Sequence, residues 1–197
     1  MALSEIKFGT DGWRAVIAKE FTFDNVRKTA QAAADYFLSQ KAGLSGAKIS
    51  VAVGYDRRFL SEQFALTAAR VLKSNGIETD VADCPVTTPA VSLLSSKKYS
   101  AAIMITASHN PPVYNGFKLR IGGKAVGESV TSQVESYLGK TAVIMKTDAA
   151  IAVRPFRKAY VEYLKSKADI RKISRLPRPV VVDNMYGSSA GILEELL

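Results

Sequence analysis

Between residues 23 and 106 the chain alternates between two hydrophobic patterns, and this alternation limits the folds open to it. In residues 23–40, apolar side chains recur every three or four positions, which predicts an amphipathic helix. Residues 48–54 instead form a short run with β-branched residues at alternate positions, which predicts a strand. Both patterns then repeat in order: we expect a helix at 61–74, a strand at 77–82, a helix from 88 and a strand at 101–106.

The order strand–helix–strand–helix–strand predicts a sheet that helices cover on both faces. We therefore expect an α/β fold, a three-layer α/β/α sandwich whose sheet is mostly parallel or mixed. Cap residues support these helices: Thr22 precedes the first, Asn75-Gly76 follows the second, and Thr88 caps the third with Pro89 in its first turn. Further along we expect an added edge strand at 116–121 and helices at 126–138 and 156–167.

Two prolines at positions 177 and 179 predict a stiff, extended link. We therefore expect residues 1–172 to form a first domain and residues 173–197 to form a linker and the start of a second. A buried strand is expected at 180–183 and a helix from about residue 189. Because one strand and one helix cannot bury their own apolar faces, we expect that the second domain has been cut off.

The composition excludes several classes of protein. Cys84 is the single cysteine and His109 the single histidine, so the chain has no internal disulfide and no zinc site of the usual kinds. A metal ion here would be a hard cation bound by oxygen. No apolar run is long enough for a membrane span, and residues 1–7 lack the apolar stretch of a secretory signal. We therefore expect a cytoplasmic protein with no membrane partner.

The positive charge gathers in residues 154–178, which hold nine basic residues and two acidic ones within a chain of net charge +9. Such a segment can attract nucleic acid or anionic substrates, although charge runs are commonly solvated helix faces. No zinc finger or aromatic-interleaved RNA motif accompanies it, which disfavours nucleic acid as a partner. A stand-alone anion- or nucleic-acid-binding module that uses this segment remains the alternative function.

The most informative motif is residues 106–112, TASHNPP, which follow the expected strand. Ligands usually bind beyond the carboxyl ends of strands in open α/β sheets, and Ser108 lies there, with Lys118 ten residues later. A serine hydroxyl near a lysine suits phosphoryl transfer. A serine hydrolase is disfavoured, because no G-x-S-x-G elbow is present and His109 directly follows Ser108. A plain turn is the remaining alternative.

Three further motifs accompany this loop. Residues 8–14, FGTDGWR, predict a tight turn whose amides can hold an anion, with Arg14 as a phosphate-binding fork, or else an ordinary turn with a surface arginine. In residues 54–58, GYDRR, Asp56 can pair with an arginine and shape the same crevice, or form a loop ion pair of little consequence. Gly116 allows a sharp return that brings Lys118 past the Ser108 loop.

Taken together, residues 8–14, 54–58, 106–112 and 114–118 resemble the motifs of the α-D-phosphohexomutase family, the phosphoglucomutases and phosphomannomutases. The resemblance covers the first domain of that family to about residue 172, and residues 180–191 resemble the opening of its second. It implies that Ser108 is a phosphoserine, that Lys118 and His109 assist proton and phosphoryl transfer, and that Arg14 supports the phosphoserine and the general acid–base step. The implied substrate- or phosphate-binding residues are Thr10, Asp11, Gly12, Asn110, Asp56 and Arg57.

The same resemblance implies reversible 1,6-phosphoryl transfer on hexose phosphates through a hexose 1,6-bisphosphate. It implies Mg²⁺ as cofactor, held by the phosphate on Ser108 and by an Asp-rich loop of the second domain that is absent from this chain. The family's third and fourth domains are absent too, so we expect the chain alone to be inactive. The choice among glucose, mannose and glucosamine phosphates stays open, as does the oligomeric state.

Overall fold

The computed structural model describes residues 6–40, 48–146, 150–173, 175 and 177–196. These residues form a seven-stranded mixed sheet with the strand order β1-β5-β4-β2-β3-β7, and β6 pairs with β5 off this path. Strands β2, β3, β4 and β7 run parallel, while β5 is antiparallel to β1, β4 and β6. The strands are β1 (Trp13–Val16), β2 (Ser50–Tyr55), β3 (Glu78–Ala82), β4 (Ala101–Ile105), β5 (Tyr114–Ile121), β6 (Lys124–Ala125) and β7 (Ala152–Arg154).

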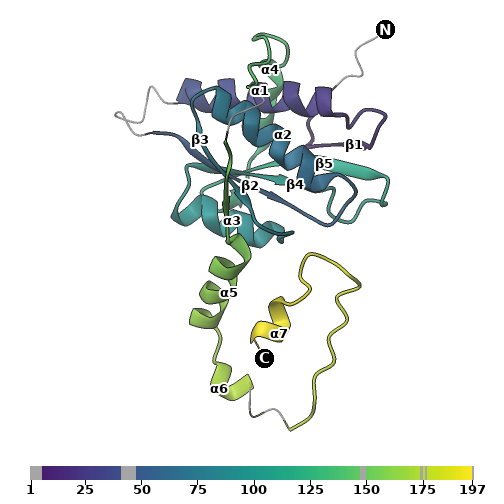
Figure 1. The fold of residues 1–197 in the computed structure, drawn as a ribbon, viewed down its shortest axis with the longest axis vertical. Helices are drawn as coiled ribbons and strands as arrows, with labels where there is room; N and C mark the ends of the chain where they lie inside the picture. The colour runs from purple at the N-terminus through teal and green to yellow at the C-terminus, as the bar shows by residue number, and fades with distance from the viewer. Residues whose placement is uncertain (1–5, 41–47, 147–149, 174, 176, 197) are drawn as a thin grey trace.

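Helices cover both faces of this sheet, which confirms the predicted three-layer α/β/α sandwich. Helices α1 and α2 pack side by side on one face, and α3 packs on the other (Figure 1). Helix α4 packs against α1, and α5 extends away from α3 below the sheet in Figure 1. The helices are α1 (Phe23–Gln40), α2 (Ser61–Ser74), α3 (Thr88–Lys97), α4 (Glu128–Ser136), α5 (Phe156–Lys167), α6 (Ile170–Ile173) and α7 (Ile192–Leu196).

The helix ends follow the cap residues closely. Thr22 Oγ1 accepts a hydrogen bond of 3.2 Å from the amide of Asn25, as expected of an N-cap. Asn75 ends α2, and Gly76 adopts a φ of +79° beyond it. The cap of α3 is Thr87 rather than Thr88, so this prediction is wrong by one residue. The predicted helix at 126–138 is present as the shorter α4.

Residues 116–121 form a strand as predicted, as part of β5, but the predicted edge position is wrong, because β5 lies between β1 and β4. Strand β1 had no counterpart in the sequence analysis, since four residues carry too little pattern to reveal a strand. It is fixed by an aromatic cluster: Trp13 stacks on Phe21 with ring centroids 4.7 Å apart, and Phe21 meets Phe64 edge-on at 4.8 Å. These contacts join β1 to α2 and bury the rings.

The C-terminal residues depart furthest from expectation. Residues 180–183 form no strand, and Val180 and Val181 are 55% and 92% exposed. An isolated segment has no neighbouring strand to satisfy its backbone, so an apolar run alone does not make a strand there. Helix α7 begins at Ile192, three residues later than expected. Leu176, which directly precedes the two prolines of the expected link, lies outside the described residues.

Within the described residues, no helix combines the length and apolar character that crossing a lipid bilayer requires.

Gly116 provides a test of how closely three strands approach one another. A Cβ at this position would lie 2.5 Å from the carbonyl oxygen of Thr106 and 3.0 Å from that of Trp13, both backbone atoms. We expect Gly116→Ala to lower the free energy of unfolding by about 2 kcal/mol, because the backbone must shift to admit the methyl group. Urea denaturation measures this change.

Gly9→Ala is the matched control, since a Cβ there meets its nearest atom at an ordinary 3.6 Å. Its free energy of unfolding should stay within about 0.5 kcal/mol of the unsubstituted protein. Equal denaturation midpoints for the two variants would contradict the packing described here.

Candidate functional site

Ser108 follows the carboxyl end of β4 and is exposed to solvent. Its φ of +59° places it in the left-handed region, which costs a residue with a Cβ about 1–2 kcal/mol. Strained backbone of this kind persists only where surrounding contacts impose it, and it is concentrated at functional sites. The loop that carries Ser108 is therefore held by its neighbours.

One guanidinium group supplies much of this support. Nη1 of Arg58 donates hydrogen bonds to the carbonyl oxygens of Pro111 and Tyr114, at 2.8 and 2.9 Å. Nη2 donates to the carbonyl oxygens of Ser108 and Asn110, at 2.8 and 2.6 Å. A single side chain thus bonds to the backbone on both sides of the two prolines in the loop.

Asp56 forms an ion pair with Arg58 and binds three segments of the chain. Its Oδ1 accepts hydrogen bonds from the Arg58 amide at 2.9 Å and from Ser61 Oγ at 2.7 Å. Its Oδ2 accepts one from Thr106 Oγ1 at 2.5 Å and lies 3.3 Å from Arg58 Nε. Thr106 Oγ1 in turn accepts a hydrogen bond of 2.9 Å from the Ser108 amide. The predicted pairing of Asp56 with an arginine is therefore present, and its partner is Arg58.

Arg57, the arginine that we placed among the binding residues, is exposed and lines a hollow beside Ser108. The turn at residues 187–188 borders the same hollow. The full lining is Asp56, Arg57, Arg58, Phe59, Ser108, Asn110, Pro112, Gly187 and Ser188. An anion that enters this hollow would thus lie next to both Arg57 and Ser108.

Residues 9–12 form the predicted tight turn, closed by a hydrogen bond of 2.8 Å from the Gly9 amide to the Gly12 carbonyl. Gly12 has a φ of +129°, and a Cβ there would lie 2.3 Å from the carbonyl oxygen of Phe117. Only glycine permits this approach. Thr10 is exposed at the tip of the turn, and Asp11 is half-buried beside it.

Asp11 is the centre of a cluster of cations. Lys118 Nζ donates to its Oδ2 at 2.7 Å, Arg120 Nη1 donates to its Oδ1 at 2.5 Å, and Arg14 Nη2 lies 3.9 Å away. Lys118 and Arg120 are only 4% and 6% exposed, so Lys118 is not a solvated surface lysine, the environment that is usual for this residue type. Burial alone would raise the pKa of Asp11, but hydrogen bonds and charges from Arg120 and Lys118 outweigh it and lower that pKa.

Arg14 connects this cluster to the serine loop, because its Nη1 donates a hydrogen bond of 2.7 Å to Asn110 Oδ1. Lys118 is therefore linked to the loop indirectly, through its contact with Asp11 and the contact of Asp11 with Arg14. Three cations around one carboxylate leave a surplus of positive charge, which favours an anionic ligand.

His109 is exposed next to Ser108. Among the described residues, no hydrogen bond joins the Ser108 hydroxyl to the His109 imidazole, so the serine hydrolase arrangement is not formed. The same residues include no group of three or more His, Cys, Asp or Glu side chains that could hold a metal ion.

Three residues of the site were missed by the sequence analysis: Arg58, Thr106 and Arg120. Arg58 lies in the GYDRR motif, but nothing in the sequence separates its role from that of Arg57. Arg120 had a usable signal, because residues two apart on a strand share one face and Lys118 was already a candidate. Thr106 lies two residues before Ser108, a spacing at which a threonine hydroxyl commonly binds a backbone amide.

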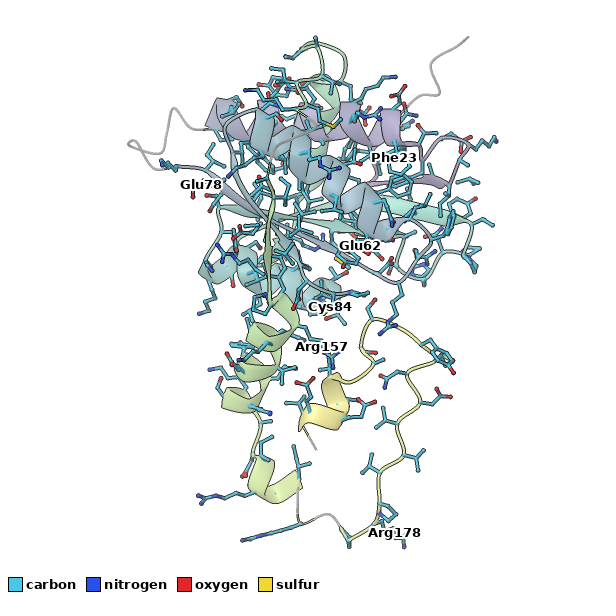
Figure 2. All side chains as sticks on the ribbon, viewed as in Figure 1. Phe23, Glu62, Glu78, Cys84, Arg157 and Arg178 are labelled. Atoms are coloured by element: carbon cyan, nitrogen blue, oxygen red, sulfur yellow. The ribbon has the colours of Figure 1, made fainter. Side chains whose placement is uncertain are left out.

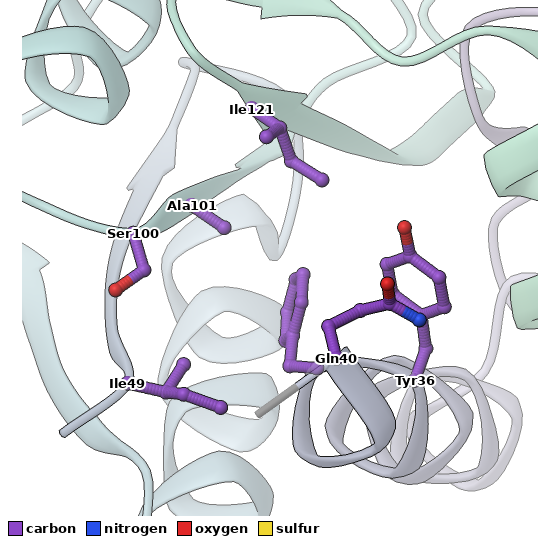
Figure 3. Close-up of a pocket in the computed structure, with 7 residues that line it drawn as sticks. Tyr36, Gln40, Ile49, Ser100, Ala101 and Ile121 are labelled. Atoms are coloured by element: carbon purple, nitrogen blue, oxygen red, sulfur yellow. The ribbon is translucent and has the colours of Figure 1, made fainter. Parts of the chain in front are cut away.

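A second pocket lies at the other end of the sheet (Figure 3). Ala101, the first residue of β4, lines it together with the preceding Ser100, whereas Ser108 follows the end of that strand. The remaining lining residues are Tyr36, Phe37, Gln40, Ile49 and Ile121. This mostly apolar pocket is thus separate from the serine loop.

The basic segment 154–178 covers α5 and α6. Figure 2 shows Arg157 on α5, with α7 beside it, and Arg157 Nη2 lies 2.7 Å from Glu195 Oε1. Arg154 and Lys172 also form ion pairs, with Asp80 and Asp169 respectively. Part of the positive charge is therefore used within the fold.

The chain is similar in sequence to known sugar-phosphate mutases. A sequence model described as phosphoglucomutase/phosphomannomutase, alpha/beta/alpha domain I, matches residues 5–144. A phosphoglucosamine mutase of Rhodococcus erythropolis is 34% identical over 190 residues, covering 94% of this chain and 42% of that protein. A phosphoglucomutase of Staphylococcus aureus is 30% identical over 210 residues, covering 98% and 37% respectively.

The fold is shared with a crystal structure from Thermus thermophilus that is named as a phosphomannomutase. Its TM-score is 0.89 at 32% identity, and the match covers 98% of this chain and 43% of that one. The chain thus spans about two fifths of the length of these relatives.

The Asp11 cluster predicts a pH-dependent contribution to stability. Asp11→Asn leaves a buried ammonium and a buried guanidinium without a counter-charge, so the free energy of unfolding at about pH 7 should fall by about 3 kcal/mol. The folded-state pKa of Asp11 lies below its ordinary value of 3.8, so this stability is present above that pH. It is lost as the pH falls through the lowered pKa.

Urea denaturation of both proteins at about pH 7 and about pH 2.5 tests this, with the difference shrinking at the acidic pH. Asp24→Asn is the control, because Asp24 pairs with Arg27 on the exposed surface of α1 and should change stability by less than about 0.5 kcal/mol. A difference that persists undiminished at the acidic pH would contradict the assignment.

Proposed function

The chain belongs to the phosphoglucomutase/phosphomannomutase family through its α/β/α domain I, and we propose that its Ser108 carries the phosphoryl group that the whole protein transfers. The reaction proposed is reversible 1,6-phosphoryl transfer on a hexose phosphate. The observation that carries it is the exposed Ser108 in a left-handed turn at the carboxyl end of β4, beside a surplus of positive charge.

In the proposed step, a sugar hydroxyl oxygen attacks the phosphorus of phosphorylated Ser108, and the bond from phosphorus to Oγ breaks. His109 takes the hydroxyl proton, which then passes to Ser108 Oγ. Lys118 and Arg14 stabilise the negative charge that the transferring group carries. In the reverse sense, Ser108 recovers a phosphoryl group from the other end of a hexose 1,6-bisphosphate.

The remaining candidates have supporting roles in this proposal. Asp11 orients Lys118 and Arg14, and Asn110 receives the Arg14 guanidinium. Arg57 binds a substrate phosphate in the hollow beside Ser108. Thr10 and Gly12 belong to the turn whose backbone amides would bind a phosphate group. Asp56 acts on the serine loop through its ion pair with Arg58.

Magnesium enters the proposal as a counter-ion of the phosphate on Ser108, because phosphate oxygens suit a hard cation. The described residues supply no cluster of carboxylates to complete such a site, so in this proposal the other ligands come from outside the described residues. No step above depends on the ion.

The proposed partners are hexose phosphates and hexose 1,6-bisphosphates, with no nucleic acid and no membrane, in a cytoplasmic protein. The ion pairs of Arg154, Arg157 and Lys172 favour a structural role for the basic segment over a nucleic-acid surface. Since the chain spans about two fifths of its relatives, the complete activity is proposed for the full-length gene product.

Replacement of Ser108 tests the proposal directly. We expect Ser108→Ala in the full-length gene product to abolish the interconversion of hexose 1- and 6-phosphates, because no oxygen is left to carry the phosphoryl group. Intact-mass analysis after incubation with glucose 1,6-bisphosphate should show a phosphoryl adduct in the unsubstituted protein and none in the variant.

Ser132→Ala is the control, because Ser132 is an exposed serine on α4. It should retain both turnover and the adduct. Undiminished turnover in Ser108→Ala would refute the mechanism.

The 197-residue chain alone should bind its substrates poorly and show no mutase turnover, because phosphoryl transfer requires the sugar to be positioned from several sides. A coupled assay of hexose 6-phosphate formation, run beside the full-length gene product, measures this. Turnover by the chain alone at a comparable rate would overturn the expectation.

A further inference from the structure

The loop that presents Ser108 contains two local backbone turns, and Val113 in the second turn also accepts a hydrogen bond of 2.8 Å from the Ile17 amide. The Asn110 amide donates to the Ala107 carbonyl at 3.1 Å, and the Tyr114 amide donates to the Pro111 carbonyl at 3.0 Å. Each bond closes one turn, and neither joins the first turn to the second. The relative position of the two turns therefore depends on groups outside the loop.

The Ile17 amide bonds to the second turn and Arg14 to the first, whereas Arg58 bonds to both, because its two terminal nitrogens donate to carbonyl oxygens in each turn. We infer that Arg58 is a positioning residue that fixes the backbone of Ser108 and with it the direction in which the serine hydroxyl is presented. This inference rests on the proposed function of Ser108 as the carrier of the phosphoryl group.

The left-handed backbone of Ser108 is constrained on both sides by one carboxylate. On the amide side, the Ser108 N–H donates to Thr106 Oγ1, and Thr106 donates to Asp56. On the carbonyl side, Ser108 accepts from Arg58, which forms an ion pair with the same Asp56. The amide and the carbonyl group of Ser108 are thus both linked to Asp56, one through Thr106 and the other through Arg58. These links keep the backbone of Ser108 at its strained φ, which would otherwise relax.

The geometry requires an arginine rather than any cation. A guanidinium is planar and directs several N–H donors in a fixed fork, whereas an ammonium is a compact group on a flexible stem. Arg58 uses its Nη1 and Nη2 for the four carbonyl oxygens and its Nε against Asp56. The side chains of Arg58 and Asp56 are each only 13% exposed, so water competes little for these bonds.

The test compares Arg58→Lys and Arg58→Ala with the unsubstituted full-length gene product. The first measurement is amide hydrogen exchange of peptides that cover residues 106–116, made without any sugar. We expect faster exchange in both variants, with little change in α1 or α2. The second is the rate at which Ser108 acquires phosphate from glucose 1,6-bisphosphate, which should fall about 100-fold in both. Lysine should not rescue the rate, whereas added guanidinium should partly restore it in Arg58→Ala.

Arg27→Lys is the matched control, because Arg27 is also paired with an aspartate, Asp24, but on the surface of α1. It should match the unsubstituted protein in both measurements. If the unsubstituted protein acquires no phosphate, the proposed function fails, and amide exchange alone then decides the positioning role. If phosphate is acquired normally but Arg58→Lys matches the unsubstituted protein in exchange or in rate, the positioning role is refuted. Global unfolding of Arg58→Lys would also refute it, because Arg58 would then be required for the stability of the whole domain and not specifically for the position of the serine loop.

Discussion

The carboxylate of Asp56 is the contact on which the serine loop depends. It lies at the end of β2 and binds the start of α2 through Ser61, the end of β4 through Thr106, and the loop itself through Arg58. A half-buried charge is tolerated only when partners replace its lost hydration, and here each oxygen has two. Since the sheet fixes the ends of β2 and β4, it also fixes this carboxylate and the loop above it.

The sequence predicts the long periodic elements well and the short ones poorly. Helices α1, α2 and α5 have the predicted bounds, because many amphipathic positions define them, and Thr22 and Asn75 also mark the start of α1 and the end of α2. Strands β1 and β7 have four and three residues, too few to show a period. Residues 180–183 carry the composition of a strand, but a strand also requires a partner, which the pattern itself does not reveal.

For the site, the motifs identified the right segments and left the individual contacts undetermined. Ser108, Arg14, Asp11 and Lys118 were all candidates, and the structure connects Arg14, Asp11 and Lys118 through ion pairs. The choice between two adjacent arginines depends on loop geometry that residue type does not encode. The buried Lys118 was equally hard to foresee, because lysine is normally exposed and only its contact with Asp11 explains the exception.

The two faces of strand β5 differ: one packs in the hydrophobic core, and the other carries the cations that bind Asp11. Phe117 is buried opposite Trp13, whereas Lys118 and Arg120, on the alternate face, reach Asp11. Shifting the pairing by a single residue would exchange these faces, placing cations among aromatic rings and rings against a carboxylate. The register that gives the lower energy for the hydrophobic interior is thus the same one that assembles the charged cluster. Any sequence drift that preserves the packing of this strand preserves the alignment of its cations as well.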